Sequence, residues 1–171
     1  QTCALPISES DIICTSRNAV KIVNSIPAEK PILFLPDMNL GNYVKKESGR
    51  ENMIIWQGAC IVHHTFAARK LITAKSEHPH ALVAAHPECP EAVLKHADFI
   101  GSTSAIIDWC VAQSAREYIV MTESGVSHSP CGNGNTLKVE GRYHVTAPAP
   151  RAASAIYCVT PRSEEHTSEL Q

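Results

Sequence analysis

Short apolar runs that alternate with helical patterns constrain the fold of this 171-residue chain more than any other feature. The runs are apolar at successive positions, which is typical of parallel strands whose two faces are both covered by helices. Alternation at this spacing predicts α/β domains of three layers, α/β/α, built on short parallel sheets. The predicted strands are Asp11–Thr15, Pro31–Leu35, Met53–Trp56, Ala81–Ala85, Asp98–Ile100 and Glu117–Met121.

The segments between these strands carry apolar residues at helical spacing, so that one face of each predicted helix can pack on a sheet. The predicted helices include Asn18–Ser25, Thr65–Ser76 and Thr103–Ala115. After about Ser127 the pattern weakens into a turn-rich stretch. The side chains expected to point inward are Ala19, Ile22, Val23, Ile26, Phe66, Leu71, Ile72, Ile106, Ile107, Cys110 and Val111.

Charge, hydropathy and cysteine spacing exclude several classes of protein. Fifteen Lys and Arg stand against 17 Asp and Glu without a basic cluster, so the positive surface of a nucleic-acid binder is missing. No apolar run reaches the roughly 18 residues that would predict a membrane span. The seven cysteines are widely spaced without a CxxC pair, which disfavours a zinc ribbon and a dense disulfide framework.

The two ends of the chain look like translated sequencing adapter. Residues 162–171 back-translate into a common adapter and residues 1–7 into its reverse complement, so both are expected to be non-native and are set aside in the fold reasoning. We expect neither end to contact the core. The segment between them is expected to be a fragment of a longer protein.

A compact polar turn follows each predicted strand. In an open parallel sheet, ligands bind beyond the carboxyl ends of the strands, and these ends all point to one edge. The turns therefore predict a shared site, although helix caps alone would also place Ser and Thr at several of these positions. The candidate site residues are Ser16, Cys60, His63, His86, Glu88, Ser102 and Thr103.

Each candidate group also has a simpler interpretation. Ser102 and Thr103 open a predicted helix and either hold an anion or merely cap the helix, and Ser16 lies in a similar turn. His86 and Glu88 either orient a substrate and move protons, or belong to an ordinary Pro-containing loop. Cys60 either works with a histidine three residues on, as a metal ligand or nucleophile, or is a buried thiol that lies near an exposed histidine by chance.

The other cysteines and histidines are expected to have structural or solvent-facing positions. Thiols in or beside apolar runs are expected to be core residues, and histidines on predicted helix surfaces or in turns are expected to face solvent. The thiols are Cys14, Cys89 and Cys110, and the histidines are His78, His80 and His96.

Five strings in a fixed order carry a resemblance to a known family. They are PDMNLGNYV, WQGACIVHHTF, HPECPEAV, ADFIGSTSAII and TESG, between about Asp11 and His128, and they closely resemble quinolinate synthases, the quinolinate synthetase A family. The resemblance implies a fold of three α/β domains around a pseudo-threefold axis. Residues 8–57 would then be the C-terminal part of the second domain, and residues 58–161 the third domain, irregular or divergent after about residue 128.

The resemblance also implies an activity and a cofactor. Enzymes of this family are cytoplasmic transferases of de novo NAD biosynthesis that condense iminoaspartate with dihydroxyacetone phosphate to quinolinate. They use a [4Fe–4S] cluster in which one iron has no protein ligand and acts as a Lewis acid. Small-molecule substrates and a functional link to L-aspartate oxidase are expected, without nucleic acid or membrane. Because the first domain is absent, the fragment alone is expected to be inactive.

The family's roles fall on individual residues of this chain. Cys60 matches a cluster ligand, and Cys158 is the candidate for the next one, because Cys131 comes too early. Ser16 matches a substrate-binding serine, and a recurring PDxxLG turn at Asp37, Asn39 and Gly41 is interpreted as structural, its Asp capping the next helix. Of the remaining candidates, His63 matches the histidine of the cysteine motif, His86 and Glu88 match groups that contact substrate, and Ser102 and Thr103 match a phosphate or carboxylate cradle.

Two other functions compete with this hypothesis. A non-catalytic α/β module could bind a small phosphorylated or dicarboxylic ligand at Ser16, Ser102 and Thr103 without iron. A hydrolase could use Cys60 and His63 as nucleophile and base.

Overall fold

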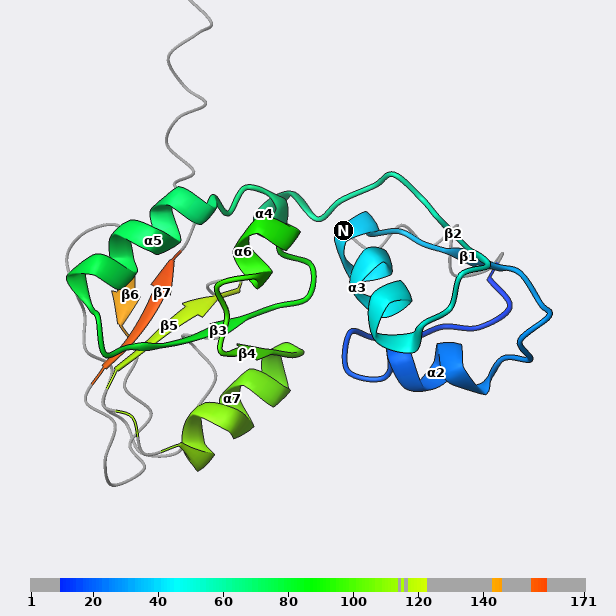
Figure 1. The fold of residues 1–171 in the computed structure, drawn as a ribbon. Helices are drawn as coiled ribbons and strands as arrows, with labels where there is room; N and C mark the ends of the chain where they lie inside the picture. The colour runs from blue at the N-terminus through cyan, green and yellow to red at the C-terminus, as the bar shows by residue number, and fades with distance from the viewer. Residues whose placement is uncertain (1–9, 114, 116, 123–142, 146–154, 160–171) are drawn as a thin grey trace, which may run out of the picture.

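Two separate sheets, each with its own helices, organise the molecule (Figure 1). The computed structural model describes residues 10–113, 115, 117–122, 143–145 and 155–159. The adapter-like ends, expected to stay off the core, lie outside these residues, as does Cys131. Within the described part, no helix is long and apolar enough to cross a membrane.

The larger sheet has five strands in the order β4-β3-β5-β7-β6. Its strands are parallel except for β6, which runs antiparallel to β7 at one edge. The central pairing is in register from Leu82 opposite Tyr118 to Ala85 opposite Met121. The strands are β3 (Leu82–Ala85), β4 (Phe99–Ile100), β5 (Glu117–Met121), β6 (Tyr143–Val145) and β7 (Ala155–Val159).

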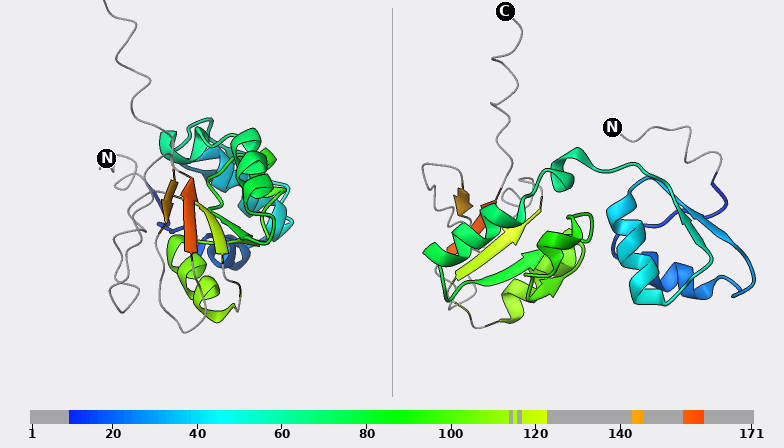
Figure 2. Two further views of the ribbon diagram at one scale, coloured as in Figure 1. Left: turned by 90° about the vertical axis from the view of Figure 1, so that its left-hand side faces the viewer. Right: turned by 45° about the horizontal axis from the view of Figure 1, so that its top comes forward.

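Helices cover this sheet on both faces, as the two views in Figure 2 show. Helices α5 (Ala68–Glu77) and α6 (Glu91–Leu94) pack on one face, and α7 (Thr103–Ala112) packs on the other. Successive strand residues alternate between the two cores, as expected for a pleated strand. Val83, Ala85, Ile119 and Met121 join the α5 and α6 side, while Ala84, Tyr118 and Val120 join the α7 side. The predicted three-layer α/β/α architecture is confirmed here.

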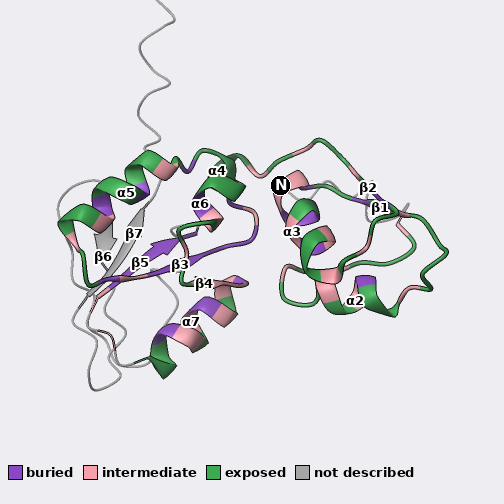
Figure 3. Cartoon of the chain, viewed as in Figure 1, coloured by how far each residue is buried: buried purple, intermediate pink, exposed green. Residues whose placement is uncertain are grey.

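The smaller sheet is a parallel pair, β1 (Ile32–Phe34) and β2 (Met53–Ile55). Helices α2 (Ala19–Ser25) and α3 (Met38–Ser48) share one core with it. Figure 3 colours the chain by burial, and along this pair the residues that alternate with the core residues Phe34 and Met53 are apolar and exposed. They are Leu33, 59% exposed, Ile54, 65% exposed, and Trp56, 58% exposed.

Helix α3 begins and ends at residues suited to those positions. The Asp37 carboxylate accepts a 2.7 Å hydrogen bond from the Leu40 backbone N–H, which is the N-cap predicted from the PDxxLG turn. Gly41 lies against β2, where an added Cβ would come within 2.8 Å of the Ile55 side chain. The helix ends at Gly49, whose φ of +64° is the left-handed conformation that glycine adopts most readily.

The predicted strand at Asp11–Thr15 is wrong. These residues form no strand, and the side chains of Ile12 and Ile13 are 53% and 61% exposed. A strand requires a hydrogen-bonded neighbour, but β1 pairs with β2, and none of the described residues pairs with Asp11–Thr15. The other five predicted strands are confirmed to within one residue at each end.

The predicted helices are shorter than expected, and two of the side chains predicted to be inward are not. Residues Ile61–His64 form a separate short helix, α4, so that α5 begins only at Ala68. Ile72 is 50% exposed and Val111 is 46% exposed. Each follows a buried residue by one position, a step of about 100° around the helix that turns it away from the sheet.

Candidate functional site

A cysteine, a histidine and a glutamate meet beyond the carboxyl ends of the strands. Cys60 is the N-cap of α4 and His63 lies within that helix, while Glu88 lies in the loop after β3. His63 Nδ1 lies 3.4 Å from Cys60 Sγ and 3.0 Å from Glu88 Oε2. The three ligand atoms all lie within 4.8 Å of one another. We call these three residues the Cys60 cluster.

His63 is buried, and several side chains contact its ring. It is 6% exposed, its Nε2 lies 3.4 Å from the hydroxyl of Thr122 at the end of β5, and its ring stacks on that of His86 with centroids 4.5 Å apart. Phe66 lies 6.2 Å from it, ring centre to ring centre. The chance interpretation required a buried thiol and an exposed histidine. The structure differs from that description, because the histidine is buried and Cys60 is half-buried.

Asp37 fixes the position of Cys60. Its Oδ2 accepts a 2.6 Å hydrogen bond from the Cys60 backbone N–H, while its Oδ1 caps α3. The preceding turn is tight: the Gly58 carbonyl accepts a 2.7 Å bond from the Met38 N–H, and a Cβ on Gly58 would overlap the Pro36 carbonyl oxygen. One buried carboxylate therefore ties the start of α3 to the candidate metal ligand.

His86 links the two units of the chain, which are the smaller sheet with its helices α2 and α3 and the larger sheet with its helices α5, α6 and α7. Its Nδ1 accepts from the Glu88 N–H at 3.3 Å, and its Nε2 lies 3.1 Å from the Ser16 hydroxyl. Since Nδ1 accepts, Nε2 carries the proton in the neutral ring. Burial, and next the charge of His63, lower the pKa of His86 to about 4, although Glu88 opposes the shift. His86 is therefore a neutral donor toward Ser16 at pH 7.

Glu88 is ionised in this setting. Burial by itself would raise the pKa of Glu88, but the hydrogen bond from His63, the charges of His86 and His63 and the hydrogen bond from Cys60 outweigh burial and lower it. The carboxylate also lies 3.9 Å from His86 Nδ1. It is thus placed to accept a proton or to bind a cation.

The remaining predicted hydroxyls lie at the start of α7 rather than on the Cys60 cluster. Ser102 caps α7 by accepting from the Ala105 N–H at 3.4 Å, and its hydroxyl lies 3.3 Å from that of Ser104. Arg17 donates to the Ser104 hydroxyl at 3.2 Å. Thr103 is the first residue of α7 and is half-buried. The adjacent residues Ser16 and Arg17 thus contact different parts of the site: Ser16 contacts His86, and Arg17 contacts Ser104 at the start of α7.

Cys158 lies in β7 opposite Val120 of β5. It is the last residue but one of its strand, so its backbone is near the same sheet edge as Thr122. This backbone position is compatible with the predicted role of Cys158 as a cluster ligand, which stays a prediction.

Three interactions of the site were not predicted. They are the contact of Thr122 with His63, the hydrogen bond of Asp37 with Cys60, and the hydrogen bond of Arg17 with Ser104. Thr122 directly follows a strand, so the polar-turn pattern that found His86 could have found it. The other two are contacts between residues far apart in sequence, and no local pattern encodes them.

The thiols predicted to be structural differ clearly from Cys60. Cys89 is 0% exposed and Cys110 is 2% exposed, and burial raises the pKa of Cys89 to about 12. Cys14 is half-buried against the smaller core. His80 and His96 are exposed as predicted. His78 is not fully solvated, because it is half-buried and lies 3.6 Å from the Glu117 carboxylate.

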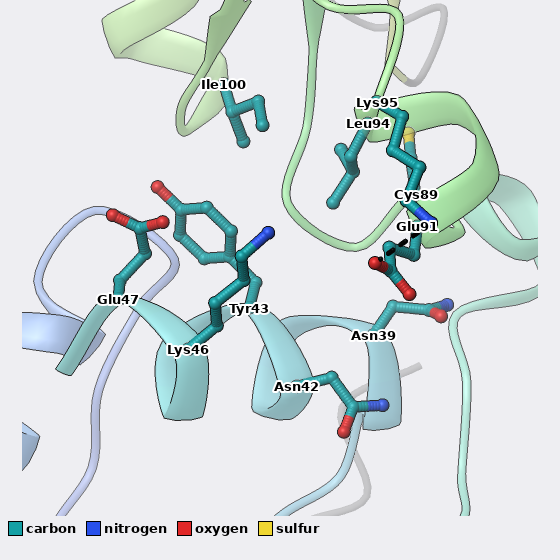
Figure 4. A pocket seen from close by; sticks show the side chains of 10 residues that line it. All are labelled: Asn39, Asn42, Tyr43, Lys46, Glu47, Cys89, Glu91, Leu94, Lys95 and Ile100. Atoms are coloured by element: carbon teal, nitrogen blue, oxygen red, sulfur yellow. Dashed lines mark ion pairs between the residues drawn. The ribbon is translucent and has the colours of Figure 1, made fainter. Parts of the chain in front are cut away.

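A groove of about 400 Å³ lies between α3 and the α6 region (Figure 4). Asn39 and Tyr43 line it from α3, and Cys89 and Leu94 line it from the opposite side. Glu91 forms an ion pair of 3.3 Å with Lys95 at its edge. The three residues of the Cys60 cluster are not among the residues that line this groove.

Known proteins resemble this chain over most of its length. The family model described as Quinolinate synthetase A protein matches residues 3–139. Quinolinate synthases of Microcystis aeruginosa and Chloroherpeton thalassium are 56% and 57% identical over 119 residues, which is 70% of this chain and 37% of each relative. That of Trichormus variabilis is 54% identical, again over 70% of this chain, and 36% of it is covered. The chain belongs to the quinolinate synthetase A family.

Proposed function

We propose that this chain is part of a quinolinate synthase that condenses iminoaspartate with dihydroxyacetone phosphate to quinolinate, in de novo NAD biosynthesis. The observation that carries the proposal is the convergence of Ser16, Cys60, His63, His86 and Glu88 from both units on one edge. The chain spans 36–37% of the length of its curated relatives, so the activity is that of the whole protein. The 171 residues alone are expected to be inactive.

A [4Fe–4S] cluster fits the Cys60 thiol at this edge. Iron–sulfur clusters are held by thiolates. Cys60 is half-buried beside the acidic and imidazole groups, whereas Cys89 and Cys110 are almost completely buried and pack in the two cores. Cys158 would be a second ligand, and a domain outside this chain would supply the third. When bound, a cluster with one iron free of protein ligands supplies a Lewis acid.

The residues around Cys60 would bind substrate and handle protons. Glu88, ionised beside His63, would accept a proton during condensation or dehydration. Neutral His86 would donate a hydrogen bond through Nε2 to Ser16 and so orient that hydroxyl. This arrangement would place a proton acceptor beside hydrogen-bond donors that can bind substrate oxygens.

Anionic groups of the substrates would lie at the start of α7. The N-terminal amides of a helix attract anions, and Arg17 brings a guanidinium 3.2 Å from the Ser104 hydroxyl there. Ser102 and Thr103 would complete a cradle for the phosphate or a carboxylate. The presence of Arg17 favours an anion-binding role over simple helix capping, because capping alone needs no positive charge.

The proposal includes partners and a location. Its small-molecule substrates imply a functional link to L-aspartate oxidase as the source of iminoaspartate. A reduced cluster and unpaired thiols such as Cys14 and Cys60 suit the cytoplasm, where thiols remain reduced.

The second candidate is a non-catalytic module that binds a phosphorylated or dicarboxylic ligand without iron. The contact of Arg17 with Ser104 favours it, because that anion cradle uses no group of the Cys60 cluster. A Cys60/His63 hydrolase is less well supported, since His63 Nδ1 lies nearer to Glu88 than to the thiol.

Anaerobic cluster reconstitution of the full-length protein tests the first proposal against the second. We expect a visible iron–sulfur absorption that Cys60→Ala abolishes and that the control Cys14→Ala leaves intact. Turnover of iminoaspartate and dihydroxyacetone phosphate should follow the cluster. Phosphate-ligand binding that is equal with and without iron, together with no cluster in the parent protein, would favour the binding module.

A further inference from the structure

Asp37 makes one hydrogen bond more than its position at the start of α3 requires. Asp37 is 4% exposed, and its Oδ1 accepts the Leu40 backbone N–H at 2.7 Å, which is the ordinary bond of an N-cap. Its Oδ2 accepts the Cys60 backbone N–H at 2.6 Å, across 23 positions of sequence. The structural interpretation of the PDxxLG turn explains the first bond and leaves the second unexplained.

The backbone around Cys60 is fixed at several points. The Gly58 carbonyl accepts a 2.7 Å bond from the Met38 N–H, and the Cys60 carbonyl accepts a 2.8 Å bond from the His64 N–H. Together with the bond to Asp37, both backbone polar groups of Cys60 are therefore occupied. Only the side chain of Cys60 is left free to rotate, so the backbone direction of its thiol is set in part from α3.

The carboxylate also brings a negative charge close to Cys60. Charges in a buried setting act more strongly than charges in water, because little solvent screens them. The reduction potential of an iron–sulfur cluster depends on the net charge and the hydrogen bonds around it. A negative charge next to a ligand opposes the addition of an electron, so it lowers the potential of a cluster bound there.

We propose that Asp37 is a positioning residue for the iron–sulfur cluster, which orients the Cys60 thiolate through its backbone and lowers the reduction potential of the cluster. This inference rests on the proposed function, because it concerns the cluster that Cys60 is proposed to bind. It adds to that proposal a group from α3, in the smaller unit, that acts on the ligand without contacting iron or substrate.

The reduction potential separates this role from helix capping. The full-length protein is reconstituted anaerobically, and the midpoint potential of its cluster is measured by a redox titration followed by electron paramagnetic resonance. Asp37→Asn keeps the shape of the side chain and one acceptor oxygen but removes the charge. We expect it to raise the midpoint potential above that of the parent.

Gly49→Ala is the matched control, because it weakens the same helix at its other end. Gly49 has a φ of +64°, a conformation that alanine adopts poorly. This variant loosens α3 while it leaves Asp37 and its bond to Cys60 in place. Its midpoint potential should match that of the parent, even if the protein is less stable.

Retention of the cluster is the second measurement. Asp37→Ala leaves the Cys60 N–H without its acceptor, and we expect it to weaken cluster retention against an iron chelator about 10- to 100-fold, the usual effect of losing an outer partner of a metal ligand. Gly49→Ala should retain the cluster as the parent does. Circular dichroism shows whether each variant is folded, and if Asp37→Ala is not, the isosteric Asp37→Asn decides.

The outcomes distinguish this inference from the proposed function. An unchanged midpoint potential in Asp37→Asn, or an equal shift in Gly49→Ala, would overturn the inference and leave the proposed function standing. If Asp37→Asn fails to take up a cluster that Gly49→Ala takes up, the orienting role is supported. If the parent protein itself takes up no cluster, the proposed function fails, and this inference fails with it.

Discussion

The two sheets of the chain are equally apolar in sequence but differently covered. Ile119, in the centre of the five-stranded sheet, is 0% exposed, whereas Ile54, in the two-stranded sheet, is 65% exposed. Helices pack on both faces of the first sheet and on one face of the second. A run that is apolar on both faces indicates that both faces are buried in the complete protein. We therefore expect the bare face of β1 and β2 to be covered there by residues outside this chain.

The largest expected difference between the sheets is in their response to truncation of an isoleucine. Ile119→Ala should lower the free energy of unfolding by about 2–5 kcal/mol, because it leaves a cavity in a packed core. Ile54→Ala, the matched control, should change it by no more than about 0.5 kcal/mol. Urea unfolding followed by far-ultraviolet circular dichroism measures both. Equal costs for the two variants would mean that the bare face is covered within this chain.

Asp37 tests how firmly the two units are joined. Asp37→Ala removes the acceptor of two backbone N–H groups, those of Leu40 and Cys60. Burying unpaired donors costs about 1–3 kcal/mol, and we expect this as easier local opening. Hydrogen exchange at the Leu40 and Cys60 amides is the measurement.

Asp37→Asn is the control for that experiment, because it keeps one acceptor oxygen. It should protect one of the two amides nearly as well as the parent. Unchanged exchange at both amides in Asp37→Ala would contradict the view that this carboxylate joins α3 to the Cys60 turn.

Ser102 is the matching cap in the other unit, and a smaller effect is expected there. Its hydroxyl makes one long bond of 3.4 Å to the Ala105 N–H, against the two short bonds of Asp37. Ser102→Ala should therefore cost about 1 kcal/mol or less, toward the low end for an N-cap. The measurement is the urea midpoint, with Ser76→Ala, an exposed serine on α5, as control. A cost above that of Asp37→Ala would reverse the ranking of the two caps.

The sequence predicted what depends on neighbouring residues and missed what depends on distant ones. Five strands and the Asp37 cap follow from local apolar runs and from a local turn. The false strand at Asp11–Thr15 has the same local signal, but no described partner strand pairs with it. The polar residues after each strand predicted a shared edge because parallel strands share a direction.

The geometry within the site could not be read in the same way. The burial of His63 depends on the stacked ring of His86 and on Thr122, which lies 59 residues away. Ser102 and Thr103 were grouped with Cys60 because all follow strands. However, α7 covers the opposite face of the sheet from α5 and α6, so the start of α7 is reached from Arg17 instead of from the Cys60 cluster.

The smallest expected effect sharpens the comparison of the two sheets. Leu33→Lys combined with Ile54→Lys places two charges on the bare face of β1 and β2, where the parent side chains are 59% and 65% exposed. Because a lysine there stays in water, the free energy of unfolding of this chain should change by no more than about 0.5 kcal/mol. Binding of the dye ANS should fall, since exposed apolar patches are what it reports. In the full-length protein the same pair should be strongly destabilising, because two charges would then be buried without partners. Equal, small effects in both proteins would show that the face stays bare, and that the apolar pattern of β1 and β2 has a cause other than burial.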